Sequence, residues 1–133
     1  LHLLAPIYES IELNKLRSNC RIYIHGHSAG GTNPSLVEAM YLGLPILAFD
    51  VIYNQVTTEF SGVYFQTKEE LLSQLLLLNS EELQGLGKQM KVIAERRYTW
   101  AHISNKYKHS ILSSRLQPIP SLPFDSPLMR TVK

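Results

Sequence analysis

The residues best suited to chemistry lie in one glycine-rich stretch, which reads HGHSAGGTNP from His25 to Pro34. The segment Gly26-His27-Ser28-Ala29-Gly30 fits the Gly-x-Ser-x-Gly pattern, which places a nucleophilic serine on a sharp turn between a strand and a helix. The same glycines, continued by Gly31 and Thr32, can instead present backbone N–H groups to a bound anion. The stretch therefore has two chemical interpretations, a serine hydrolase site and a phosphate-binding loop.

Three features of the sequence weigh against the hydrolase. In a nucleophile turn the helix begins at the serine, so Pro34 would lie inside the helix and cost about 3 kcal/mol. The acid and the base should follow well downstream, but Asp50 ends the very next strand, and His102 and His109 fall in an amphipathic helix. No HGGG-like oxyanion loop precedes the strand. We rank the serine hydrolase third among the possible functions.

The anion-binding interpretation uses the residues that follow the glycines. Asn33 can cap a helix that begins at Pro34, whose missing N–H costs nothing at a first helical position. Glu38, one turn further on, can accept hydrogen bonds from two ribose hydroxyls. No Lys follows the glycines, so the loop is not a Walker A sequence. A diphosphate at the helix tip and a ribose at Glu38 together predict a nucleoside diphosphate ligand.

The surrounding pattern predicts alternating strands and helices. We expect strands within residues 1–5, 21–25, 46–49 and 63–65, and helices over residues 10–19, 34–42, 68–78, from 80 and 99–114, with a possible turn at 54–58. Ser10, Ser80 and Thr99 are the expected caps of their helices. Such alternation indicates an α/β fold, Rossmann-like, with three α/β/α layers around a parallel sheet. About four strands are fewer than a complete nucleotide-binding domain has, so we expect a part of a domain.

Several side chains have an expected structural role only. Trp100, Tyr107 and the leucines of residues 71–78 are predicted to be core. The pair Gly85 and Gly87 is predicted to break or loosen its helix.

Two acidic residues have an open role. Asp50 could face a ligand or simply end its strand, and for Glu59 a donor contact and a solvated position are equally plausible.

Composition limits the function classes. A chain of 133 residues with 44% hydrophobic and 18% charged residues is a globular domain, which we place at residues 1–115. A net charge of +2 argues against nucleic acid as a partner, and one cysteine argues for a reducing, cytoplasmic location. The sequence has no Asp-x-Asp pair and no cluster of metal-binding residues, so no metal site is predicted. No cofactor is predicted either. Four prolines predict that residues 116–133 are extended or disordered.

The run GGTNPSLVEAMYLGLPILAFDV resembles the donor-binding core of family 4 glycosyltransferases with the GT-B fold. That family carries two glutamates eight positions apart, which correspond to positions 30 and 38 here, then Ala-Met and a Gly-x-Pro before a strand. Glu38-Ala39-Met40 and Gly43-Leu44-Pro45 match. The segments Asn54 to Glu59, Gly62 to Phe65, and Arg97 to Trp100 follow in the family's order. The resemblance covers residues 3–114, and its loop is similar to that of the rhamnosyltransferase-like branch.

The resemblance implies a partial C-terminal domain of a hexosyltransferase-type enzyme that binds a nucleotide-sugar donor, with dTDP-rhamnose and a UDP-sugar as the alternatives. The implied acceptor is a growing surface polysaccharide or a lipid-linked saccharide, reached at the inner face of a membrane together with an N-terminal acceptor domain. The candidate donor-binding residues are Gly30, Gly31, Thr32, Asn33, Ser35 and Glu38. The sequence departs from the family at its first glutamate, which is Gly30 here. His25 and His27 are therefore candidates for contact with the sugar or diphosphate and for stabilising the leaving group.

The alternative is a non-catalytic nucleotide-binding module or an inactive fragment. The chain starts at Leu1, inside an apolar run, so we expect a segment of a longer protein that has negligible transferase activity by itself.

Overall fold

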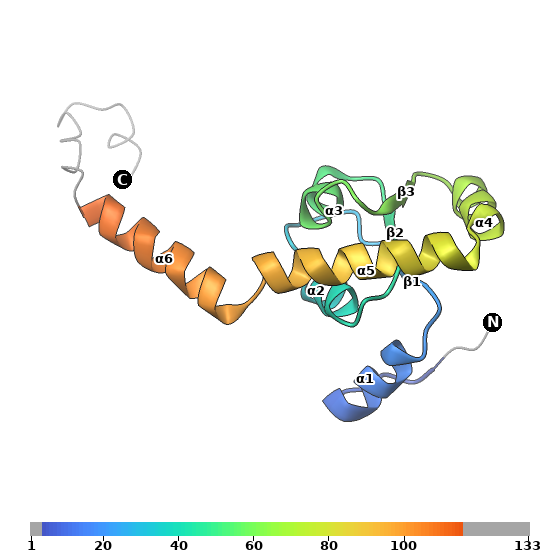
Figure 1. Ribbon diagram of the computed structural model, residues 1–133, viewed down its shortest axis with the longest axis horizontal. Coiled ribbons are helices and arrows are strands. Elements are labelled where there is room, and N and C mark those ends of the chain that lie inside the picture. Colours follow the sequence, from blue (N-terminus) through green and yellow to red (C-terminus); the bar gives the residue numbers. More distant parts are fainter. Residues whose placement is uncertain (1–3, 116–133) are drawn as a thin grey trace, which may run out of the picture.

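The computed structural model describes residues 4–115, and these form a parallel three-stranded sheet flanked by helices (Figure 1). The strands are β1 (Tyr23–His25), β2 (Ile46–Phe49) and β3 (Val63–Phe65), in the order β1-β2-β3. Ile24 is paired with Leu47, and Ala48 with Tyr64. The predicted α/β class with Rossmann-like parallel strands is confirmed.

The described residues also contain six helices. They are α1 (Ser10–Ser18), α2 (Pro34–Tyr41), α3 (Ile52–Thr57), α4 (Lys68–Leu77), α5 (Ser80–Arg97) and α6 (Trp100–Arg115). None of them is both long and apolar enough to cross a membrane.

The strand predicted within residues 1–5 is not observed in the part that is described. Residues 4–9 form no strand, Leu4 is 62% exposed, and residues 1–3 lie outside the described range. An apolar run becomes a buried strand only when a neighbouring strand and a covering layer meet it, and neither does so here. The prediction for residues 116–133 also lies outside the described residues.

The core lies between β2 and the helices α2 and α5. Its buried members are Leu36, Ala39, Met40, Leu44, Ile46, Ala48, Met90, Ile93 and Ala94. Leu47, which points away from its neighbours Ile46 and Ala48, is fully buried as well. A central strand covered on both faces explains why residues 46–49 are uninterruptedly apolar.

Gly87 determines how closely α5 can approach this core. A Cβ atom at Gly87 would lie 2.2 Å from the carbonyl oxygen of Gly43, whereas one at Gly85 would meet open space. The helix α5 is continuous through both glycines, so the prediction that they break it is wrong. Gly87 is required because two backbones touch there.

The predicted core roles of Trp100, Tyr107 and the leucines of residues 71–78 are largely wrong. Trp100 is 85% exposed and Tyr107 is 68% exposed, because α6 projects away from the sheet and α5 (Figure 1). Leu72, Leu76 and Leu77 on α4 are exposed too. An amphipathic pattern predicts an apolar face but does not show what covers it.

The helix starts agree with the sequence to within one residue, except that α3 begins at Ile52, two residues before the turn predicted at 54–58. Thr99 accepts a hydrogen bond from the His102 N–H at 3.3 Å, as expected of a cap. The cap of α5 is Asn79 rather than Ser80, because Asn79 and Glu82 form a reciprocal capping box. The residue before α1 is Glu9, and it makes no side-chain capping bond.

Candidate functional site

The glycine-rich loop ends at the helix start that the sequence predicts. The Asn33 side chain accepts a hydrogen bond from the Ser35 N–H at 3.0 Å and one from the Ser35 hydroxyl at 2.7 Å, and Pro34 is the first residue of α2. In the described part of the chain, the N–H groups of Gly30, Gly31 and Thr32 have no hydrogen-bond partner. Exposed amides and a positive helix end are the features that bind anions.

Gly30 has a backbone conformation that suits glycine better than the glutamate carried by the family that the sequence resembles. Its φ of +92° lies in the region that glycine tolerates and other residues rarely adopt. A Cβ at this position would lie 3.7 Å from Nε2 of His27. A glutamate would therefore be strained at position 30, and His27 is the side chain nearest to the place where it would begin.

Asn54 ties the loop to the carboxyl end of β2. The residue is 2% exposed, and its Nδ2 donates to the carbonyl oxygens of His27 at 3.0 Å and Phe49 at 2.9 Å. Two chain segments that are far apart in sequence are thus joined at the sheet edge where ligands bind in such folds. The sequence predicted only a possible turn at 54–58 and carried no signal for this contact.

His25 and His27 lie next to each other at the same edge. Their ring centroids are 5.9 Å apart, and the His25 ring also stacks on Tyr23. His25 is buried, and its Nε2 has no hydrogen-bond partner within residues 4–115. Burial, and after it the electrostatic effect of the neighbouring His27, lowers the pKa of His25, which favours its neutral imidazole. His27 is exposed.

Glu38 contacts a residue that the sequence did not assign to the site. The guanidinium of Arg17, in the last turn of α1, is hydrogen-bonded to Oε2 of Glu38. The Arg17 side chain is 14% exposed and that of Glu38 is 55% exposed. Arg17 occupies one carboxylate oxygen, so a ribose would have to use the other or displace Arg17.

Two further acidic candidates are held within the protein. Asp50 accepts hydrogen bonds from the side chains of Gln55 and Gln66. Glu59, whose φ is +51°, forms ion pairs with Arg96 and Arg97 at the end of α5. Their carboxylates therefore bind protein groups in this structure.

Ser28 does not have the geometry of a nucleophile turn. The helix starts at Pro34, six residues beyond the serine, and His102 and His109 lie on α6. No group of three or more potential ligand residues that could hold a metal ion occurs within the described residues.

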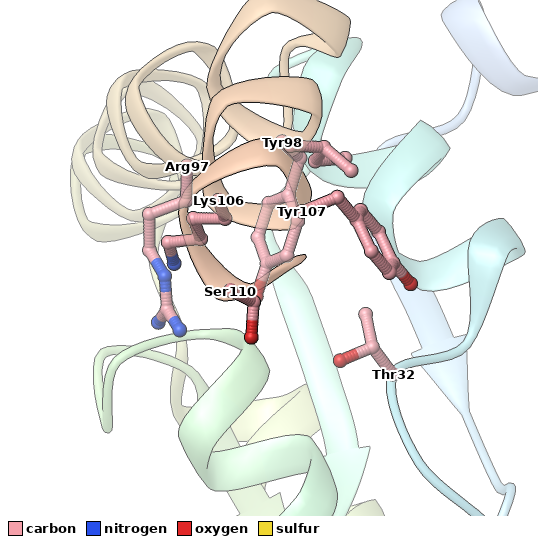
Figure 2. A pocket seen from close by; sticks show the side chains of 7 residues that line it. Thr32, Arg97, Tyr98, Lys106, Tyr107 and Ser110 are labelled. Carbon is pink, nitrogen blue, oxygen red and sulfur yellow. The ribbon is translucent and has the colours of Figure 1, made fainter. Parts of the chain in front are cut away.

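A cavity of about 490 Å³ lies beside the loop, between Thr32 and α6. Figure 2 shows Thr32 of the loop near the side chains of Tyr107 and Ser110, which come from α6. Arg97, Tyr98, Ile103 and Lys106 complete its lining. None of these residues from α5, α6 and the connection between them could be assigned to a site from the sequence, because their proximity to Thr32 depends on the fold.

The fold and the loop form a Rossmann-like α/β unit, in which a strand, a glycine-rich loop and a capped helix meet at the carboxyl edge of a parallel sheet. The chain is 26% identical over 108 residues to the GtfA subunit of a UDP-N-acetylglucosamine–peptide N-acetylglucosaminyltransferase from Streptococcus parasanguinis. The match covers 78% of this chain, which spans about a fifth (21%) of the length of that relative. No protein-family model and no solved structure matches the chain. The chain is therefore distantly related to a glycosyltransferase subunit.

Proposed function

We propose that this chain is the donor-binding part of a glycosyltransferase and that it binds a nucleotide-diphosphate sugar at the tip of α2. The observation that carries the proposal is the unpartnered run of N–H groups at Gly30, Gly31 and Thr32 in front of a capped helix. The distant relationship to a glycosyltransferase subunit supports it.

In this proposal the diphosphate lies against the loop amides and the positive end of α2. These groups stabilise the negative charge that develops on the leaving nucleotide when the sugar is transferred, as fixed dipoles do at other active sites. Asn33 and Ser35 are hydrogen-bonded to each other and hold the helix start in place. Their role is to position the amides.

The two histidines supply the contact that a glutamate at position 30 would have made. His27 is exposed and lies next to Gly30, and the neighbouring His25 has a buried Nε2 without a partner among the described residues. His25 or His27 would contact the transferred sugar or the diphosphate. The donor is dTDP-rhamnose or a UDP-sugar, and the acceptor is a growing surface polysaccharide or a lipid-linked saccharide.

Glu38 binds the ribose through the carboxylate oxygen that Arg17 leaves free. The acceptor and any general base would come from another domain of the complete protein. Because the donor and the acceptor would be bound by different parts of the protein, we expect residues 1–133 alone to bind the nucleotide but to show negligible sugar transfer.

Calorimetric titration with UDP, dTDP and UDP-glucose tests the proposal. We expect binding of a nucleoside diphosphate, weakened about tenfold by Glu38→Ala through the loss of a charged hydrogen-bond acceptor. Glu69→Ala, in the first turn of α4, is a matched control that should leave affinity unchanged. Donor binding without transfer in the complete protein would favour the non-catalytic module instead.

A fluorophosphonate probe addresses the remaining alternative. Labelling that is lost in Ser28→Ala would support a serine hydrolase. The proposed function predicts no such labelling and unchanged donor binding in that variant.

A further inference from the structure

The cavity between the loop and α6 contains polar groups that have no protein partner. The hydroxyls of Thr32, Tyr107 and Ser110 form no hydrogen bond with the described residues. The ammonium group of Lys106 likewise has no acidic partner there. The cavity thus offers three hydroxyls and one unneutralised cation.

The other two polar side chains of the cavity have partners. Arg97 donates to the carbonyl oxygen of Val56 at 2.8 Å and pairs with Glu59 at 3.3 Å. The Tyr98 hydroxyl donates to the carbonyl oxygen of Thr57 at 3.0 Å. Arg97 also lies over the Tyr98 ring, 5.4 Å from its centroid. These contacts fix one wall of the cavity, so a ligand meets a preformed surface there.

The exposed Tyr107 ring indicates the kind of ligand. A tyrosine that is 68% exposed at a cavity presents a flat apolar face with a polar tip, which suits the C–H face of a sugar ring. Figure 2 shows the Tyr107 ring and Thr32 on one side of the view and the charged ends of Arg97 and Lys106 on the other. A ligand that fills the cavity would combine a sugar ring at one end with an anionic group at the other.

We propose that this cavity binds a glycosyl phosphate, with its sugar ring against Tyr107 and its phosphate at Lys106. A volume of about 490 Å³ lies within the size range of small-molecule sites. The inference rests on the proposed function, because Thr32 belongs both to the cavity and to the candidate diphosphate loop. The ligand could be the sugar-phosphate part of a donor or a separate phosphorylated saccharide, and both have the same chemistry.

Titration of the complete protein with glucose 1-phosphate, followed by the amide signals of Thr32 and residues 103–110, tests this proposal. We expect binding in the native chain, weakened about tenfold or more by Lys106→Gln, because a hydrogen bond to a charged group is lost. Tyr107→Ala should weaken it as well. Lys108→Gln is the matched control, since Lys108 lies on the same helix but outside the lining of this cavity. Equal affinity in Lys106→Gln, Tyr107→Ala and Lys108→Gln, or no binding of glucose 1-phosphate, would overturn the proposal.

A parallel titration with UDP separates this inference from the proposed function. If UDP binds and glucose 1-phosphate does not, the cavity proposal fails while the donor site stands. If glucose 1-phosphate binds in the presence of saturating UDP, the ligand is a second, phosphorylated saccharide. If UDP displaces it, the cavity holds the sugar-phosphate part of the donor.

Discussion

The guanidinium of Arg17 binds the carboxylate of Glu38, and this ion pair joins α1 to the helix that carries the candidate donor site. The helix α1 has no buried residues, so little apolar packing holds it. The acid that the sequence assigns to a ribose therefore also anchors a neighbouring helix.

Arg17→Gln should loosen α1 and cost about 1 kcal/mol of stability, the upper end for a partly exposed ion pair. Amide hydrogen exchange over residues 10–18 measures the loosening directly. Lys15→Gln, on the same helix, is the control and should leave exchange unchanged. Unaltered exchange in Arg17→Gln would mean that other contacts hold α1.

Asn54→Ala should destabilise the protein by about 1–3 kcal/mol, because it leaves the carbonyl oxygen of His27 without a donor among the described residues and that of Phe49 with the Val51 N–H alone. Urea denaturation measures the loss, and Asn105→Ala, at an exposed position of α6, provides the comparison. The loosened loop should also bind UDP more weakly. A variant as stable as the native chain would show that Asn54 does not hold the loop.

Gly87→Ala and Gly85→Ala should have opposite effects although both add one methyl group to α5. At Gly87 the methyl meets the Gly43 carbonyl, and the forced shift should cost about 1–3 kcal/mol. At Gly85 it meets open space, and alanine should stabilise the helix by up to about 1 kcal/mol. Thermal melting of the two variants tests this contrast, which equal melting temperatures would refute.

Stability should fall as the pH is lowered through about 6.5, the ordinary pKa of histidine. The folded pKa of His25 is below that value, so the unfolded chain binds the proton more readily and acid favours unfolding. Denaturation at several pH values should show a shallower dependence in His25→Gln than in His109→Gln, which changes an exposed histidine. Parallel curves for the two variants would rule out His25 as the origin.

Features that depend on residues close together in the sequence could be predicted from it. The Asn33-Pro34 pair predicted the start of α2, and uninterrupted apolar residues predicted β2 as a strand covered on both faces. The contacts of Arg17 with Glu38 and of Asn54 with His27 join residues 21 and 27 positions apart. They depend on how the elements pack, for which no local pattern exists.

The exposure of side chains was equally hard to predict. The apolar positions of α6 recur at helical spacing, but the helix projects from the core and leaves Trp100 and Tyr107 exposed. Gly87 was misjudged because helix propensity describes one helix alone. The missing side chain of Gly87 instead allows its backbone to contact that of Gly43.

The most direct test of the central claim is to follow the backbone amide signals of an isotope-labelled chain during titration with UDP. The proposed donor site predicts saturable shifts at Gly30, Gly31, Thr32 and Ser35, which Glu38→Ala weakens and Glu69→Ala does not. Saturable binding whose shifts lie elsewhere, or no binding of either UDP or dTDP, would contradict the assignment of the tip of α2 as the diphosphate site.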